Sequence, residues 1–122
     1  MLKIEKPGSP GFDTVVKNDH FKCAFITYSP CYAFGAVDHM KRHNNTDEIF
    51  VLLSDRAVLL IMDNDEIQKH EMEQGSAYNV GRATWHYLAV SGDARVFAAE
   101  RSDTDGTNTD VIRFDVPYIL SE

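Results

Sequence analysis

The sequence predicts an all-β fold, a barrel of the jelly-roll type, for three reasons. Apolar and polar residues alternate with a period of two over several segments of strand length. Glycine, proline, asparagine and aspartate separate these segments at short intervals. Roughly eight such segments follow one another, as small barrels and jelly rolls require. We find no internal repeat and no sign of a second domain, so we expect one domain over residues 1–122.

The N-terminal part of the chain predicts an arm and then a first strand. Prolines and glycines cluster within residues 1–20, which indicates an irregular N-terminal arm. Residues 21–28 alternate as a strand does, until Ser29-Pro30 interrupts the pattern.

The middle of the chain predicts three strands with polar turns between them. Residues 32–41 alternate as a strand, and the polar residues 44–46 form a turn. A strand over residues 48–53 is followed by a hairpin loop and a strand over residues 57–62. This last strand is apolar on both faces, so we expect both of its faces to be covered, by a sandwich-like barrel and a dimer partner.

The C-terminal part predicts three further strands, and it contains two segments that fit either a strand or a helix. The strands occupy residues 76–80, 85–91 and 95–101. Residues 66–73 are polar and fit an exposed strand or a helical turn. Residues 102–110 are rich in Asp, Thr, Gly and Asn and predict a loop. Residues 111–120 fit a final strand or a short helix, and the proline within them limits either.

Charge and hydropathy exclude several classes of function. Nineteen acidic and twelve basic residues give a formal net charge of −7. Phosphate backbones and anionic membranes are bound by clustered lysine and arginine, so we expect no nucleic-acid partner and no membrane surface. No apolar run approaches the roughly 20 residues of a membrane span, and the first residues lack a signal peptide's apolar segment. We expect a cytoplasmic protein.

Two histidines and a glutamate predict a metal site. His43 precedes Glu48, which opens an apolar strand, and His86 lies on a later strand after a turn. An ionised carboxylate among apolar neighbours is costly unless it is paired or bound to a cation. Two imidazoles and one carboxylate suit Fe, Mn, Ni or Zn as divalent ions and leave positions open for a ligand. The alternative is a metal-free site in which Glu48 is hydrogen-bonded or paired.

The first of these segments resembles the first motif of the cupin family of small β-barrels. That motif contains a glycine, a His-x-His pair, a glutamate and a closing glycine. Gly35, His43 and Glu48 match three of these positions. Lys41 replaces the first histidine of the pair, and Asp55 replaces the closing glycine.

The second segment resembles the second cupin motif. Gly75 matches its opening glycine and His86 its histidine. Gly81 stands where proline is usual, Ala83 where glycine is usual, and Val90 replaces the asparagine. The resemblance covers roughly residues 30–101 and implies a cupin-like double-stranded β-helix for the whole chain.

The resemblance implies a small-molecule ligand at a metal, which the family usually holds with three histidines and one glutamate. Oxygenase, isomerase and lyase activities occur in the family, and so do binding proteins without catalysis, so the fold alone does not choose among them. Because Lys41 replaces one ligand, a second hypothesis stays open. In that hypothesis Lys41 pairs with Glu48, and a metal-free barrel binds or senses a metabolite.

Further residues are candidates for an additional ligand or for the pocket wall. They are Tyr32, Phe34, His39, Lys41, Tyr78 and Glu100. Trp85, Tyr87 and Phe97 fall on the face opposite His86 and predict either a dimer surface or a second packed face. We expect a homodimer.

Overall fold

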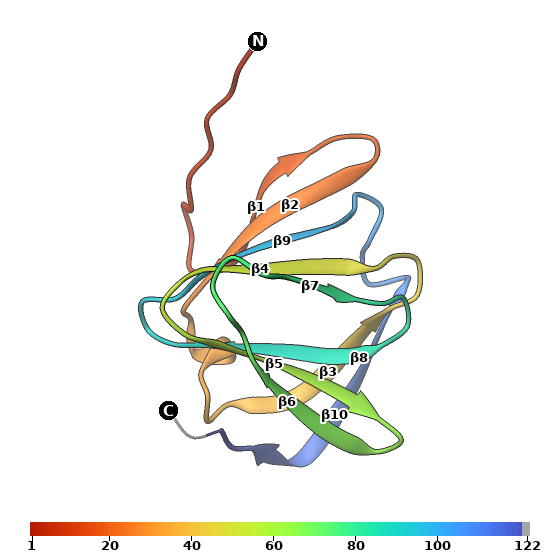
Figure 1. Cartoon of the computed structure of the whole chain (residues 1–122). Helices are drawn as coiled ribbons and strands as arrows, with labels where there is room; N and C mark the ends of the chain where they lie inside the picture. Colours follow the sequence, from red (N-terminus) through yellow and green to blue (C-terminus); the bar gives the residue numbers. More distant parts are fainter. Residues whose placement is uncertain (121–122) are drawn as a thin grey trace.

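The computed structural model describes residues 1–120; residues 121–122, the end of the predicted domain, lie outside this range. The described residues form two five-stranded antiparallel sheets that close into a jelly-roll barrel (Figure 1). The strands are β1 (Gly11–Lys17), β2 (Phe21–Thr27), β3 (Val37–His43), β4 (Glu48–Ser54), β5 (Ala57–Asp63), β6 (Glu66–Glu71), β7 (Ala77–Val80), β8 (Trp85–Val90), β9 (Arg95–Arg101) and β10 (Thr109–Tyr118). The predicted all-β fold is confirmed.

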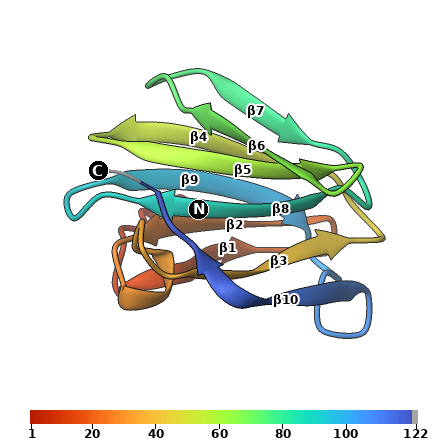
Figure 2. The same cartoon turned by 90° about the horizontal axis from the view of Figure 1, so that it is seen from below.

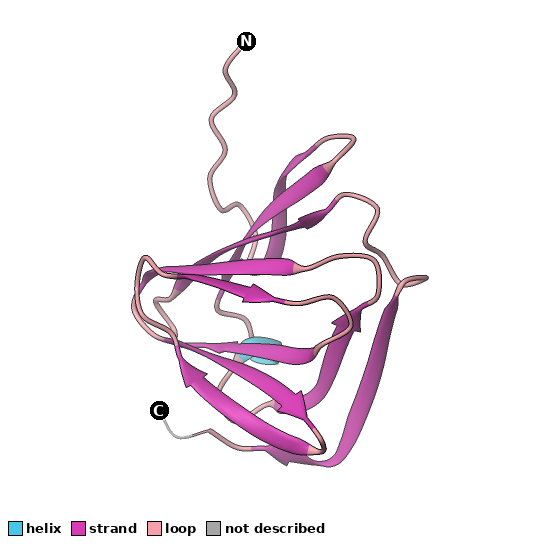
Figure 3. Ribbon diagram, turned by 45° about the vertical axis from the view of Figure 1, so that its right-hand side comes forward, coloured by secondary structure: helices cyan, strands magenta, loops and turns pink. Residues whose placement is uncertain are grey.

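The first sheet has the strand order β1-β2-β9-β4-β7, and the second has the order β10-β3-β8-β5-β6. Figure 2 shows β10 and β3 side by side at one edge of the second sheet, with β5 and β6 toward the other. In residues 1–120 the one helical segment is the short 3-10 turn η1 (Pro30–Tyr32), so no helix there is long enough to cross a membrane (Figure 3).

The buried apolar residues form two clusters, one between the sheets and one on the outer face of the second sheet. The inner cluster fills the barrel and draws on both sheets, with Ile26, Phe50, Leu52, Leu59, Leu88, Val90 and Val96 among its members. The outer cluster covers the other face of the second sheet and contains Phe34, Val37, Met40, Val58, Leu60, Tyr87, Ala89 and Leu120. The strand β5 contributes to both clusters, as its apolar faces predicted. Its outer face is covered by this chain itself.

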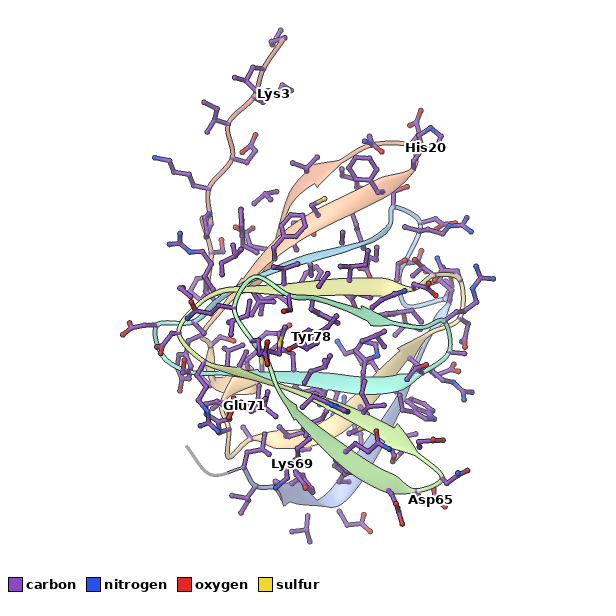
Figure 4. All side chains as sticks on the ribbon, viewed as in Figure 1. Lys3, His20, Asp65, Lys69, Glu71 and Tyr78 are labelled. Atoms are coloured by element: carbon purple, nitrogen blue, oxygen red, sulfur yellow. The ribbon has the colours of Figure 1, made fainter. Side chains whose placement is uncertain are left out.

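The N-terminal arm differs from the expectation. Strand β1 lies inside the predicted irregular range 1–20 and pairs with β2. The clustered prolines and glycines end at Gly11, whose positive φ of 81° is a conformation that glycine adopts readily. Strand β1 begins at this residue and continues with ordinary strand-forming residues. Residues 1–8 have no regular structure, and Lys3 stands away from the barrel (Figure 4).

The strand predicted over residues 32–41 begins later than expected. Pro30 opens the turn η1, for which its fixed φ is suited, and β3 starts only at Val37. The strand then continues to His43. The two open segments are resolved as strands, β6 and β10, and Pro117 is tolerated because β10 is an edge strand.

The three aromatic residues opposite His86 do not share one surface. Trp85 and Tyr87 belong to the outer cluster of the second sheet or pack against it, so they form a second packed face. Phe97 lies on the first sheet and meets Phe25 edge to face, with ring centroids 6.1 Å apart. The homodimer stays a prediction.

Candidate metal centre

Glu48 is the buried carboxylate at the start of β4. The period of two places it on the inward face with Phe50 and Leu52, and 5% of its side chain is exposed. An anion among such neighbours needs a partner of opposite charge. The start of β4 gathers with the end of β3 and the start of β8 at one end of the barrel, on the right of Figure 1.

His43 and His86 converge on one oxygen of this carboxylate. The Nε2 atom of His43 lies 3.2 Å from Glu48 Oε1, and the Nε2 atom of His86 lies 3.1 Å from the same oxygen. The three ligand atoms lie within 4.8 Å of one another. The structure therefore brings together the three residues that the sequence singled out, although they come from three strands.

The other nitrogen of each imidazole is held by the surrounding strands. His43 Nδ1 shares a hydrogen bond of 2.8 Å with the Thr109 hydroxyl, because Thr109 of β10 lies directly opposite His43 in the ladder. His86 Nδ1 lies 2.9 Å from the Thr84 carbonyl oxygen. A carbonyl oxygen can only accept, so Nδ1 of His86 carries a proton. Such partners fix the orientation of metal-ligating histidines.

This arrangement requires a positive charge between His86 and Glu48. With its proton on Nδ1, a neutral His86 presents a lone pair at Nε2, and Glu48 Oε1 presents another. Two lone pairs 3.1 Å apart repel unless a proton or a cation lies between them. A bond length of about 2.0–2.2 Å to each ligand would place neighbouring ligands about 3 Å apart, which fits these separations. The donor set therefore fits a divalent metal.

The pKa of Glu48 reflects these neighbours. Burial alone raises the pKa of this carboxyl, but the hydrogen bonds and charges of His43 and His86 outweigh burial, and the pKa is lowered. Glu48 is therefore ionised near neutral pH and available as a metal ligand.

A second buried carboxylate, Glu100 of β9, faces the same centre. Its Oε2 atom lies 3.6 Å from His43 Nε2, and its Oε1 atom lies 3.5 Å from Lys22 Nζ. Lys22 lies opposite Glu100 in the β2–β9 ladder and also donates to the Thr104 carbonyl at 2.8 Å. Burial and the negative charge of Glu48 raise the pKa of Glu100.

A cavity of about 460 Å³ opens in front of these groups. Its wall combines the polar residues named above with apolar ones, and it includes Phe12, Ile26, Tyr32, Phe50, Leu88 and Val111. Lys41 lies directly opposite His86 in the β3–β8 ladder and also lines the cavity. Among residues 1–120 the ion pairs of Glu48 are with His43 and His86, so the expected Lys41–Glu48 pair is wrong.

Three of the predicted pocket residues lie elsewhere. His39 pairs with Asp38 at 2.7 Å, and its ring lies 4.5 Å from that of Tyr87, outside the cavity wall. Phe34 belongs to the outer cluster. Tyr78 packs against the inner cluster and accepts a hydrogen bond from the Glu73 backbone. The pairing of β3 with β10 is regular from His43 to His39, and its irregularity begins beyond His39, toward Val37.

Sequence reasoning missed Lys22, Thr84 and Thr109. Lys22 shares its strand parity with the buried residues Ala24 and Ile26, so alternation alone could have placed it inside the barrel. The roles of Thr84 and Thr109 depend on a turn and on strand pairing, for which the sequence holds no local signal.

Comparisons with known proteins support the fold. No protein-family model and no curated protein matches this chain. Among solved structures, KdgF from a Halomonas species is 16% identical over 75% of this chain and 78% of that one, with a TM-score of 0.59. A cupin-2 domain protein from Shewanella frigidimarina is 12% identical over 80% and 84%, with a TM-score of 0.56.

A third similar structure is a variant of QdtA from Thermoanaerobacterium thermosaccharolyticum. This 3,4-ketoisomerase, in complex with TDP-4-keto-6-deoxyglucose, is 13% identical over 72% of this chain and 63% of that one, with a TM-score of 0.60. At these identities the likeness establishes the fold. The chain has the cupin fold, as the resemblance implied.

Proposed function

We propose that this chain is a cupin that binds a small polar metabolite at a divalent metal held by His43, Glu48 and His86. An oxygenase, isomerase or lyase activity is the type of function that suits this site best. The observation that carries the proposal is the convergence of both Nε2 atoms on Glu48 Oε1, at 3.2 and 3.1 Å, while His86 Nδ1 holds its own proton.

A divalent ion at this place would supply Lewis acidity toward a carbonyl or carboxylate of the ligand. The chain itself contributes orientation and exclusion of water. Thr109 and Thr84 fix the two imidazole rings, and the apolar wall with Phe50 and Leu88 shields the centre from one side. Lys41 has no ion-pair partner among residues 1–120, so its ammonium group is available to an anionic part of the metabolite.

The size of the cavity and one comparison support the class of ligand. About 460 Å³ lies within the range of roughly 300–1,000 Å³ that is usual for small-molecule sites. The ketoisomerase QdtA carries a keto sugar on the same fold. A metabolite with a carbonyl beside hydroxyl or carboxylate groups would suit a wall that is polar at the metal and apolar around it.

A metal-free binding protein is the second candidate. The separations of 3.1 and 3.2 Å are also hydrogen-bond lengths, so a protonated His86 could satisfy Glu48 without a metal. In this case the cavity would bind a metabolite without Lewis-acid chemistry.

Metal titration separates the two candidates. Protein stripped with a chelator and dialysed is titrated with Mn²⁺, Ni²⁺ and Zn²⁺, and with Fe²⁺ in the absence of oxygen, by calorimetry. We expect one site per chain in the wild type and its loss in His86→Ala. His39→Ala is the matched control, because His39 lies outside the cavity wall, and it should keep the site. A wild type that binds none of the four ions would contradict the proposal and favour the metal-free protein.

A further inference from the structure

Glu100 occupies a place that the cupin motifs do not account for. It lies near the end of β9 on the same inward face as Val96 and Ala98, and 6% of its side chain is exposed. Strand β9 pairs with β4, and this pairing brings Glu100 beside the start of β4, where Glu48 lies. Two carboxylates therefore share one buried end of the barrel.

The two oxygens of Glu100 have different surroundings. Oε1 faces the ammonium group of Lys22 at 3.5 Å. Oε2 is buried and has no hydrogen-bond partner among residues 1–120, and it lies 3.6 Å from His43 Nε2, the atom that also approaches Glu48 Oε1. A buried oxygen without a partner loses its hydration and gains nothing in return. Glu100 Oε2 lies beside His43 Nε2, which also approaches Glu48 Oε1. A cation bound between these atoms would supply the partner that Oε2 lacks.

We propose that Glu100 is a fourth protein ligand of the metal, through Oε2, the oxygen that the contact of Lys22 with Oε1 leaves free. This inference rests on the proposed function. It replaces the ligand lost at Lys41 by a carboxylate from another strand, so the site is formed by β3, β4, β8 and β9.

The charges of the site agree with this assignment. The two carboxylates carry a charge of −2, of which Lys22 offsets one at Glu100 Oε1, and a divalent ion would supply the remaining positive charge inside the barrel. Without an ion, the negative charges of Glu48 and Glu100 repel each other across a buried space. An additional oxygen ligand also makes the donor set harder, which favours Mn²⁺ or Fe²⁺ relative to a site with three imidazoles.

The contact with Lys22 explains how Glu100 is oriented. Two contacts hold the ammonium group of Lys22. Its Nζ atom donates to the Thr104 carbonyl at 2.8 Å and lies 3.5 Å from Glu100 Oε1. One carboxylate oxygen is thereby engaged, and the other remains for the metal. In the described residues Lys22 makes no ion pair with His43, Glu48 or His86, so it acts on the site through the orientation of the Glu100 carboxylate.

Three variants of the full chain test the inference. Glu100→Gln removes the charge and weakens the ligand, Glu100→His offers a neutral nitrogen ligand in the same place, and Glu73→Gln removes an exposed charge as a matched control. Circular dichroism establishes that each variant is folded. Calorimetry with Mn²⁺ gives the affinity, and the visible absorption of the Co²⁺ form gives the coordination.

If Glu100 is a ligand, Glu100→Gln should weaken Mn²⁺ binding by about tenfold or more and shift the Co²⁺ bands, while Glu73→Gln leaves both unchanged. Glu100→His should bind Co²⁺ and shift its absorption bands. The shifted bands should indicate a ligand field at least as strong as that of the wild type. Unchanged Co²⁺ bands in Glu100→Gln would overturn the inference, whether or not affinity falls, since charge alone would then be at work. A wild type that binds no metal would contradict the proposed function instead, so the two failures are distinguishable.

Discussion

The Nε2 atom of His86 and the Oε1 atom of Glu48 lie 3.1 Å apart, although the proton of a neutral His86 is held at Nδ1 by the Thr84 carbonyl. Two atoms that can both only accept are thus brought into contact. The closure of the barrel imposes this contact, because His86 and Glu48 lie on the inward faces of β8 and β4, which belong to the two different sheets. Either a proton or a metal ion must join them, and these two states compete.

The competition predicts how metal affinity depends on pH. Binding the ion must release the proton that otherwise lies between His86 and Glu48. We expect the affinity to fall as the pH falls, by about tenfold per pH unit for each proton displaced. Calorimetry in two buffers of different ionisation enthalpy measures the number of protons released. Proton release near zero at mildly acidic pH would show that the ion binds elsewhere.

The Thr109 hydroxyl predicts an effect transmitted through His43. Thr109→Val keeps the shape of the side chain and removes the partner of His43 Nδ1, which lies 2.8 Å from the hydroxyl. We expect metal affinity to fall by about tenfold, with the number of sites unchanged. Thr14→Val, on the exposed face of β1, is the control and should leave the affinity as it is. Equal affinities in wild type and Thr109→Val would show that the hydroxyl does not orient the ring.

Replacement of Ala83 by glycine should stabilise the folded protein. This residue stands where cupins have glycine, and its φ of 60° lies in the left-handed region, while its backbone N–H donates to the His43 carbonyl at 2.8 Å. Relief of this strain by Ala83→Gly exceeds the entropic cost of glycine, so the free energy of unfolding should rise by about 0.5–1 kcal/mol. Urea denaturation measures this change. Ala77→Gly in strand β7 is the control and should lower stability by about 0.5–1 kcal/mol.

Glu48 predicts a dependence of stability on pH in the metal-free protein. Its pKa is lower in the folded state than in the unfolded chain, so its contribution is present above the usual range of a glutamate. That contribution is lost as the pH falls through the lowered pKa. Glu48→Gln should therefore cost about 1–3 kcal/mol at pH 7 and progressively less below about pH 4.5. Unfolding in urea at several pH values tests this, and a loss that is independent of pH would contradict it.

Much of the site could be predicted because strand alternation is a local signal. Glu48 shares its parity with Phe50 and Leu52, and His86 shares its parity with Leu88 and Val90, so both had to face the core. The spacing of His43 and Glu48 across a turn added the third ligand. These inferences needed only neighbouring residues.

The remainder depends on register between distant strands, which no local pattern determines. Lys22 meets Glu100 and Thr109 meets His43 only because of the pairings of β2 with β9 and of β3 with β10. The same dependence explains the error over Lys41. Its place in the first motif, where a metal-binding histidine is usual, suggested Glu48 as its partner. The ladder instead places Lys41 opposite His86 and leaves both histidines nearer to the carboxylate.

The most direct test of the central claim is anomalous diffraction from crystals grown with Mn²⁺, recorded on both sides of the manganese absorption edge. The account predicts one strong peak within about 2.0–2.3 Å of His43 Nε2, Glu48 and His86 Nε2. No peak at this place, with His86 still 3.1 Å from Glu48 as in a proton-bridged pair, would contradict it.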